Sequence, residues 1–217
     1  PNRSLSRLDS CVTPSTSGSG RLGKRKKTGA FWHTDATNKE CPPNYTSLYP
    51  FELPSSGGET FIANMRAGYA VLPDDVKQRI ANMKTANILV GKVAAQRPDI
   101  YGGTMDLIDF QKGQAPVIQP LVRTHPVDKS KVLYFNQIKI ENILGMTPEE
   151  SHDLLDELLE MALRPEFIYA HQWRMGDMLI WDNRSVFHKA GHKKGESYAE
   201  DEHRTLWRIT IRGDRPF

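Results

Sequence analysis

A histidine and an aspartate lie two residues apart in the segment FWHTDATN, residues 31–38. Side chains two apart on an extended strand project from the same face, so His33 and Asp35 would form a two-ligand clamp for a metal ion. A third candidate ligand, His188, occurs in the segment WDNRSVFHKAGH. Two imidazoles and one carboxylate that leave other coordination positions open are the ligand set of non-haem Fe(II) oxygenases. The pattern therefore indicates a metal centre.

Two arginines near the C-terminus could bind anions. Arg204 and Arg208 lie four apart in HRTLWRITIR, hence on one face of a strand and about 13 Å apart along it. A guanidinium binds a carboxylate with two parallel hydrogen bonds and does not lose its charge. An inward-facing pair would need anionic partners, because burying an unpaired charge is costly. The alternative is that both face solvent while Trp207, Ile209 and Ile211 fill the core, and the sequence leaves both open.

The composition is that of one ordinary soluble domain. The chain has 217 residues, of which 38% are hydrophobic and 25% are charged, and this length is enough to bury one sizeable core. The net charge is +3, yet residues 1–30 hold seven lysines and arginines against Asp9 alone. The basic character therefore belongs to this segment, and we do not expect the rest of the chain to bind nucleic acid.

Cysteine content and hydropathy indicate where in the cell the protein is expected. Cys11 and Cys41 are the two cysteines, too few for a disulfide framework or a cysteine-based zinc cluster. A cytoplasmic location is therefore expected. The chain has no run of about 18 apolar residues that could cross a bilayer, and no apolar core follows the basic N-terminal residues as in a signal peptide. No membrane partner is expected.

The chain divides at about residue 28. Residues 1–28 contain STSGSG and RLGKRKK, a composition typical of a flexible basic tail, unless the segment is an incomplete N-terminal part of the domain. From residue 29 to residue 217 the pattern is that of a single globular domain. Apolar residues with helical spacing predict helices over residues 59–72 and 73–83.

The clearest helix is predicted over residues 147–163. Thr147 is a preferred N-cap, Pro148 suits the first helical position, and Glu150 completes a capping box. Strands are predicted over four apolar or alternating segments: 131–136, 166–173, 178–183 and 204–212. Short strands around a few helices, without regular alternation of the two, favour an α+β jelly-roll over a parallel βαβ fold.

Several motifs together carry a family resemblance. They are WHTD, ELPSSGGETFIAN, VRTHPV, PEF, WDNRSVFH and RTLWRITIRGDRP, in this order over residues 29–217. The chain resembles the taurine dioxygenase (TauD/TfdA) family of Fe(II)/2-oxoglutarate-dependent dioxygenases. The resemblance implies a double-stranded β-helix core, which is the cupin-like form of the jelly-roll, with flanking helices.

The resemblance also implies the roles of individual residues. His33, Asp35 and His188 would hold Fe(II), while Thr60 and Arg204 would hold the distal carboxylate of the cosubstrate 2-oxoglutarate. Arg208 matches the arginine that holds the acidic group of the substrate in the taurine enzyme. A hydroxyl beside a guanidinium is a sound carboxylate site, and a second arginine suggests a second anion.

The implied reaction uses O2 to oxidise a C–H bond of a small acidic substrate, most simply by hydroxylation, with release of succinate and CO2. The presence of Asp35 favours hydroxylation over halogenation, because halogenating relatives lack this carboxylate. Lys139 stands where the taurine enzyme places an aromatic residue, which makes taurine a poor candidate substrate. Lys139 could contact a substrate carboxylate or phosphate, or it could be a solvated edge residue.

Three alternatives remain open. The same ligands suit a zinc hydrolase, which would need a nearby general base and would have no use for Thr60 and Arg204. The fold could instead be a binding module without turnover. The segment KTGAFWH together with His192 also resembles the branch of the family that forms isonitriles. A homo-oligomer is an expectation as well, since members of the family commonly associate.

Overall fold

Two antiparallel sheets dominate the computed structural model, which describes residues 12–15, 31–96, 115–191 and 203–217. The first sheet has the strand order β1-β12-β2-β10 and the second has the order β11-β3-β9. Their bounds are β1 Val12–Ser15, β2 Tyr45–Glu52, β3 Thr60–Asn64, β9 Ile168–His171, β10 Leu179–Asp182, β11 Val186–Ala190 and β12 Thr205–Ile211. Apart from β1, the tail expected over residues 1–28 lies outside the described residues, as does His192.

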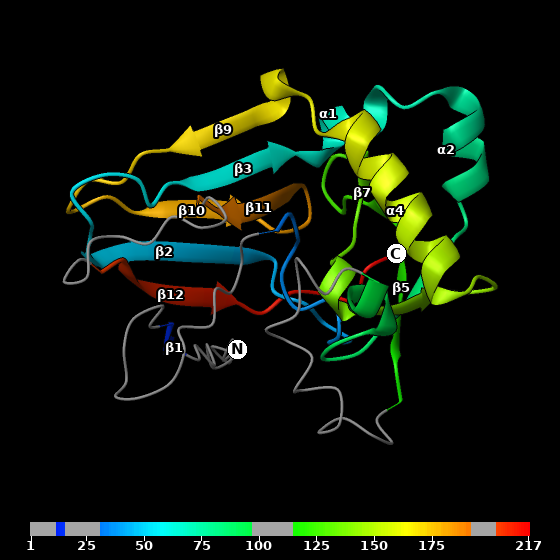
Figure 1. The fold of residues 1–217 in the computed structure, drawn as a ribbon, viewed down its shortest axis with the longest axis horizontal. Helices are drawn as coiled ribbons and strands as arrows, with labels where there is room; N and C mark the ends of the chain where they lie inside the picture. Colours follow the sequence, from blue (N-terminus) through cyan, green and yellow to red (C-terminus); the bar gives the residue numbers. More distant parts are fainter. Residues whose placement is uncertain (1–11, 16–30, 97–114, 192–202) are drawn as a thin grey trace, which may run out of the picture.

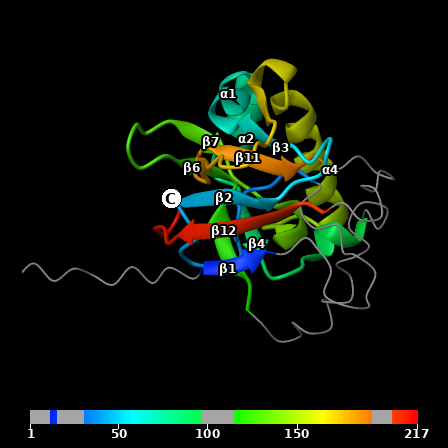
Figure 2. The same cartoon turned by 90° about the vertical axis from the view of Figure 1, so that its left-hand side faces the viewer.

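Helices and smaller sheets complete the fold. Figure 1 shows the helices gathered on one side of the two main sheets, and Figure 2 gives the view at a right angle. The α-helices are α1 Met65–Ala70, α2 Asp74–Ile80 and α4 Pro148–Ala162, and short 3-10 helices cover Lys92–Gln96, Gln137–Lys139 and Pro165–Phe167. The remaining strands are β4 Lys84–Asn87, β5 Val117–Pro120, β6 Val122–Thr124, β7 Lys131–Leu133 and β8 Ile140–Ile143. None of the helices in the described ranges is long and apolar enough to cross a membrane.

Helix α4 forms as its sequence predicts. The Thr147 hydroxyl accepts a hydrogen bond from the Glu150 backbone N–H at 3.2 Å, and the Glu150 carboxylate accepts one from the Thr147 N–H at 2.8 Å. This is the complete capping box. The leucines of the helix join the main core, where Phe187 of β11 packs edge-on against Phe135 at 4.8 Å. The core thereby fixes β11, the strand that also carries His188.

The helix predicted over residues 59–72 is wrong in its first half. Residues Thr60–Asn64 form strand β3, which pairs with both β11 and β9, and only then does helix α1 begin. Thr60, Phe61 and Ile62 are residue types that favour strands. Asn64 then caps α1, because its side-chain oxygen accepts hydrogen bonds from the N–H groups of Arg66 and Ala67. Asparagine is a preferred N-cap, so it marks the boundary that helical spacing alone obscured.

The other predicted elements exist with shifted ends. The helix predicted over 73–83 is α2, and Pro73 is its N-cap residue and not its first helical residue. The strand predicted over 131–136 ends at Leu133. The strand predicted over 166–173 begins with a 3-10 turn. Within the predicted N-terminal tail, Val12–Ser15 pairs with β12, so this short segment has a defined backbone partner.

The orientation of strand β12 decides between the two alternatives for its arginines. Arg204, directly before the strand, is only 7% exposed, whereas Trp207 is 49% exposed. Ile209 and Ile211 lie on the same exposed face as Trp207. The alternative in which these apolar residues fill the core is therefore wrong, and the arginines lie on the inner face.

Candidate metal centre

A single β-bridge brings the two candidate histidines together. The His33 N–H donates to the His188 carbonyl at 3.1 Å, and the His188 N–H donates to the His33 carbonyl at 2.9 Å. The expected strand around His33 is reduced to this bridge, and Ala36, with φ at +52°, turns the chain just after Asp35. The two imidazole rings lie 4.2 Å apart between centroids. Residues 155 positions apart in sequence thus become direct neighbours.

The Asp35 carboxylate completes the group. Its Oδ1 atom lies 3.9 Å from His33 Nε2 and 3.7 Å from His188 Nε2. All three side chains offer ligand atoms within 4.8 Å of one another. A metal ion about 2.0–2.2 Å from each ligand atom holds neighbouring ligand atoms no more than about 4.4 Å apart. Both histidine–aspartate pairs satisfy that limit, so the geometry suits a bound ion.

The protonation states of these groups also suit a cation. Burial lowers the pKa of His33, and burial together with the neighbouring His33 lowers the pKa of His188 to about 3. Burial alone would raise the pKa of Asp35, but His188, Arg208 and other partners hold it well below its usual range. The group therefore presents two neutral imidazoles and a carboxylate near neutral pH. His33 Nδ1 lies 2.8 Å from the Phe31 carbonyl, which places the proton on Nδ1 and leaves the Nε2 lone pair for a metal.

A second polar group lies at Arg204. Its Nη2 donates to Thr60 Oγ1 at 2.8 Å and its Nε donates to the Gly58 carbonyl at 2.6 Å. The Thr60 hydroxyl also accepts a hydrogen bond from the indole N–H of Trp173 at 3.0 Å. Thr60 pairs in register with Ala190, two residues beyond His188 on β11. The structure therefore brings the expected cosubstrate residues together, on the sheet that carries a candidate metal ligand.

Arg208 contacts the metal-ligand candidate itself. Its Nη2 lies 2.7 Å from Asp35 Oδ1, and its side chain is about one-third exposed. We expected this arginine to hold an acidic substrate, and the structure places it where the candidate metal group meets solvent. Arg208 therefore carries a positive charge at the edge of the centre.

Comparison with known proteins identifies the family. The family described as "Taurine catabolism dioxygenase TauD, TfdA family" has a model that matches residues 6–210. This chain belongs to that family. The alpha-ketoglutarate-dependent 2,4-dichlorophenoxyacetate dioxygenase of Burkholderia sp. (strain RASC) is 34% identical over 85% of this chain and 58% of its own length. The alpha-ketoglutarate-dependent sulfonate dioxygenase of Saccharomyces cerevisiae is 32% identical over 85% of this chain and 42% of its own length.

Solved structures agree with the TauD/TfdA assignment. AAD-2 in complex with Mn(II) and N-oxalylglycine has a TM-score of 0.77 and 29% identity, covering 94% of this chain and 73% of that chain. A taurine dioxygenase from Burkholderia xenovorans has a TM-score of 0.68 and 30% identity, covering 87% and 58%. This chain spans about three fifths of the length of several curated relatives, with 58%, 60% and 62% covered.

Lys139 is the remaining predicted site residue of this TauD/TfdA chain. Its Nζ donates to the Leu89 carbonyl at 2.7 Å, and the side chain is half-buried. Burial lowers the pKa of Lys139, while the negative charge of Asp35 raises it. Lys139 is therefore not a solvated edge residue, and its charge is felt at the metal group. A contact with substrate stays a prediction.

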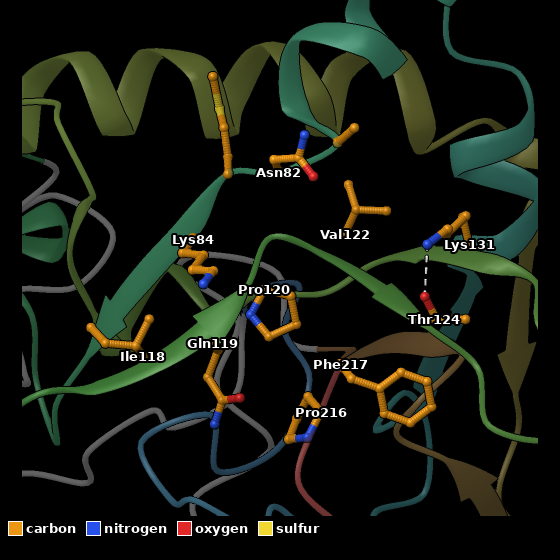
Figure 3. A pocket seen from close by; sticks show the side chains of 12 residues that line it. Asn82, Lys84, Ile118, Gln119, Pro120, Val122, Thr124, Lys131, Pro216 and Phe217 are labelled. Carbon is orange, nitrogen blue, oxygen red and sulfur yellow. Dashed lines mark hydrogen bonds between the residues drawn. The ribbon is translucent and has the colours of Figure 1, made fainter.

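A cavity of about 690 Å³ lies elsewhere in the fold. Figure 3 shows that its lining includes Lys84 and Lys131, with Pro216 and Phe217 from the C-terminal segment. The Lys131 ammonium donates to the Thr124 hydroxyl at 2.7 Å. Its lining contains none of the residues of the metal group and no histidine or acidic side chain. This cavity is therefore separate from the candidate metal group.

Three residues around the TauD/TfdA site were not found from the sequence. Trp173 contacts Thr60, Thr46 contacts Asp35, and Asn183 contacts Thr46. Asn183 lies in the WDNR segment, five residues before His188, and that proximity was the available signal. Thr46 and Trp173 carry no local signal, because only the sheet pairing brings them to the site.

Proposed function

We propose that this protein is a non-haem Fe(II)/2-oxoglutarate-dependent dioxygenase. It would oxidise a C–H bond of a small acidic molecule, most simply by hydroxylation, and release succinate and CO2. The observation that supports the proposal is one arrangement: the ligand atoms of His33, Asp35 and His188 lie within 4.8 Å of one another, and Arg204 donates a hydrogen bond to Thr60, which lies on the sheet of His188. A zinc hydrolase needs the first group and has no use for the second.

The three metal-group residues would hold Fe(II) through the two Nε2 atoms and Asp35 Oδ1. When bound, the ion and 2-oxoglutarate together supply the oxidising power, with O2 as the oxidant. The chain contributes position and electrostatics. Its neutral imidazoles and ionised carboxylate are ready to bind a divalent ion without first losing protons.

The Thr60 and Arg204 side chains would bind the distal carboxylate of 2-oxoglutarate. The Thr60 oxygen already accepts hydrogen bonds from Trp173 and Arg204. Since a hydroxyl has two acceptor positions and one proton, the Thr60 proton is the part that remains for an incoming oxygen. A carboxylate there would receive a hydroxyl proton beside a guanidinium charge, which is a strong anion site.

Arg208 and Lys139 would set the preference for an acidic substrate. Both put positive charge near Asp35. Relatives are named for 2,4-dichlorophenoxyacetate, sulfonates and sulfate esters, which all carry an anionic group. The proposed substrate class is accordingly a small organic carboxylate, sulfonate or sulfate ester.

The proposal includes the architecture around the site. The two main sheets would form the double-stranded β-helix core of a domain over residues 29–217, and residues 1–28 would be a basic tail. The similarity to AAD-2 supports the first point. We also propose a cytoplasmic location and a homo-oligomer, the latter supported by apolar side chains on the outer face of β2 and β12.

The test is an anaerobic titration of the Fe(II)-loaded protein with 2-oxoglutarate, followed in visible absorption. A metal-to-ligand charge-transfer band is expected, since the keto acid would chelate the ion. In Asp35→Ala the band should be lost with the metal. Bound Fe(II) without the band in the unchanged protein would point to a hydrolase or a silent binding module. Oxygen consumption that requires 2-oxoglutarate would then separate turnover from binding.

A further inference from the structure

The two oxygens of the Asp35 carboxylate have different surroundings. Oδ1 faces both imidazoles and Arg208. Oδ2 accepts a hydrogen bond from the Thr46 hydroxyl at 2.6 Å. Thr46 is 0% exposed and Asp35 is 5% exposed, so water does not compete for this bond. The carboxylate thus has one oxygen toward the metal group and one toward the protein interior.

The Thr46 hydroxyl belongs to a chain of buried hydrogen bonds. It accepts a hydrogen bond from the Asn183 side-chain N–H at 2.8 Å. The Asn183 side-chain oxygen, Oδ1, accepts one from the Trp181 indole N–H at 3.0 Å. An indole N–H can only donate, and an ionised carboxylate can only accept. The two ends therefore fix the direction of every bond between them. Only one orientation of the Asn183 amide satisfies both neighbours, and the Thr46 proton is committed to Asp35 Oδ2.

Backbone contacts hold this chain in place. Thr46 on β2 pairs in register with Trp181 on β10. The backbone N–H of Asn183 donates to the backbone carbonyl of Asn44 at 2.8 Å, and the backbone carbonyl of Asn183 accepts from the Thr34 hydroxyl at 2.7 Å. Thr34 lies between His33 and Asp35. The segment that carries His33 and Asp35 is thus hydrogen-bonded to the turn before β11, the strand that carries His188.

We propose that Thr46, oriented by Asn183, is a positioning residue that keeps Asp35 a monodentate metal ligand, an inference that rests on the proposed iron centre. An O–H···O⁻ bond of 2.6 Å is in the range of strong charge-assisted bonds. Turning Oδ2 toward the ion would break that bond and leave buried donors unpaired. The carboxylate would therefore occupy one coordination position only. Other positions on the ion would stay available for 2-oxoglutarate and O2.

The test compares variants that differ in one hydroxyl. Thr46→Val keeps the shape and removes the O–H, whereas Thr46→Ser keeps the O–H. Thr210→Val is the control, because Thr210 lies opposite Thr46 on β12. We would measure the anaerobic Kd for Fe(II) and the visible absorption spectrum of the Co(II)-loaded protein. Loss of a hydrogen bond to a metal ligand typically costs about 10–100-fold in metal affinity.

Thr46→Val should weaken Fe(II) binding by about 10–100-fold and change the Co(II) spectrum, as a carboxylate free to bind through both oxygens alters the coordination. Thr46→Ser and Thr210→Val should match the unchanged protein. Should Thr46→Val not fold, Thr46→Ser against Thr46→Ala gives the same comparison. A variant without the hydroxyl that matches the unchanged protein in both Kd and spectrum would overturn the inference.

The same data separate this inference from the proposed function. An unchanged protein that binds no divalent metal would overturn both. Another outcome is that the protein without substitutions binds metal but not 2-oxoglutarate, while loss of the Thr46 hydroxyl still weakens metal binding. That outcome would support the role of Thr46 and overturn the dioxygenase proposal. The Co(II) spectrum is informative because a merely structural hydrogen bond would affect stability without altering the coordination of the ion.

Discussion

Arg208 Nη2 lies 2.7 Å from Asp35 Oδ1, the same oxygen that faces Nε2 of both His33 and His188. A guanidinium and a candidate metal site therefore meet at one carboxylate oxygen. Because a guanidinium carries five N–H donors in a planar fork, the bond to Asp35 does not use up its capacity. An anionic group held by its other donors would be placed close to the metal group.

Replacing Arg208 should therefore affect acidic substrates selectively. A hydrogen bond to a charged group contributes about 1.5–3 kcal/mol, so Arg208→Gln should lower kcat/KM for an aryloxyacetate by about 10–100-fold. The neutral amide of the same compound should be turned over as before. Paired measurements of 2-oxoglutarate-dependent oxygen consumption check this. Equal losses for the acid and the amide would show that Arg208 acts through Asp35 and not as a substrate anchor.

Replacing Arg204 should instead affect the cosubstrate. Arg204→Gln removes the charge beside Thr60, and the KM for 2-oxoglutarate should rise by about 10–100-fold from loss of a charge-assisted bond. The KM for the primary substrate should change much less. Arg212→Gln, an exposed arginine just beyond β12, is the matched control. An unchanged 2-oxoglutarate dependence in Arg204→Gln would rule out the anion site formed with Thr60.

Removing one imidazole should abolish the stabilisation that metal provides. A ligand at 100 times its Kd stabilises the folded state by about 2.7 kcal/mol, which raises the melting temperature on addition of Fe(II) or Mn(II) under anaerobic conditions. His188→Ala should show no such rise. His152→Ala, on helix α4, should respond like the unchanged protein. A metal-induced rise that persists in His188→Ala would place the ion elsewhere.

Local signals in the sequence account for the elements that were predicted well. Helix α4 begins at its predicted residue because the capping box and the leucine stripe are both short-range features. The segment 59–72 was mistaken for one helix because the pairing of β3 with β11 and β9 is long-range and overrides spacing. Spacing described the apolar pattern and missed Asn64, which ends the strand and caps the helix.

The residues of the candidate site also divide into those that the sequence predicts and those that depend on the pairing of strands. The spacing of His33 and Asp35 predicts a clamp, since both lie in one extended segment. Residue type also made His188 a candidate ligand and Arg204 a candidate anion-binding residue, whereas Thr60 came only from the family resemblance. The structure brings His188 to His33 and Asp35, and it brings Arg204 to Thr60. The hydrogen bonds of Thr46 and Trp173 could not be predicted, because they depend on which strand lies opposite which. Contacts of that kind follow from sheet register and not from local sequence.

The outer face of β2 and β12 should mediate self-association. Phe51, which is 59% exposed, stacks on Trp207 at 5.6 Å between ring centroids, and Tyr49 lies directly opposite Trp207 in the register. Ile209 and Ile211 extend this apolar surface along β12. Contiguous exposed apolar surface on a folded protein commonly marks an interaction site.

Introducing charge on this surface should therefore favour the monomer. The double variant Phe51→Lys, Trp207→Lys puts two like charges where two copies would meet, and their desolvation opposes association. Sedimentation velocity over a range of protein concentrations should show a shift to the monomer. Val127→Lys is the matched control, because Val127 is 76% exposed and lies between β6 and β7, outside strands β2 and β12. If the double variant and the control sediment alike, the apolar face is not the surface through which copies of this chain associate.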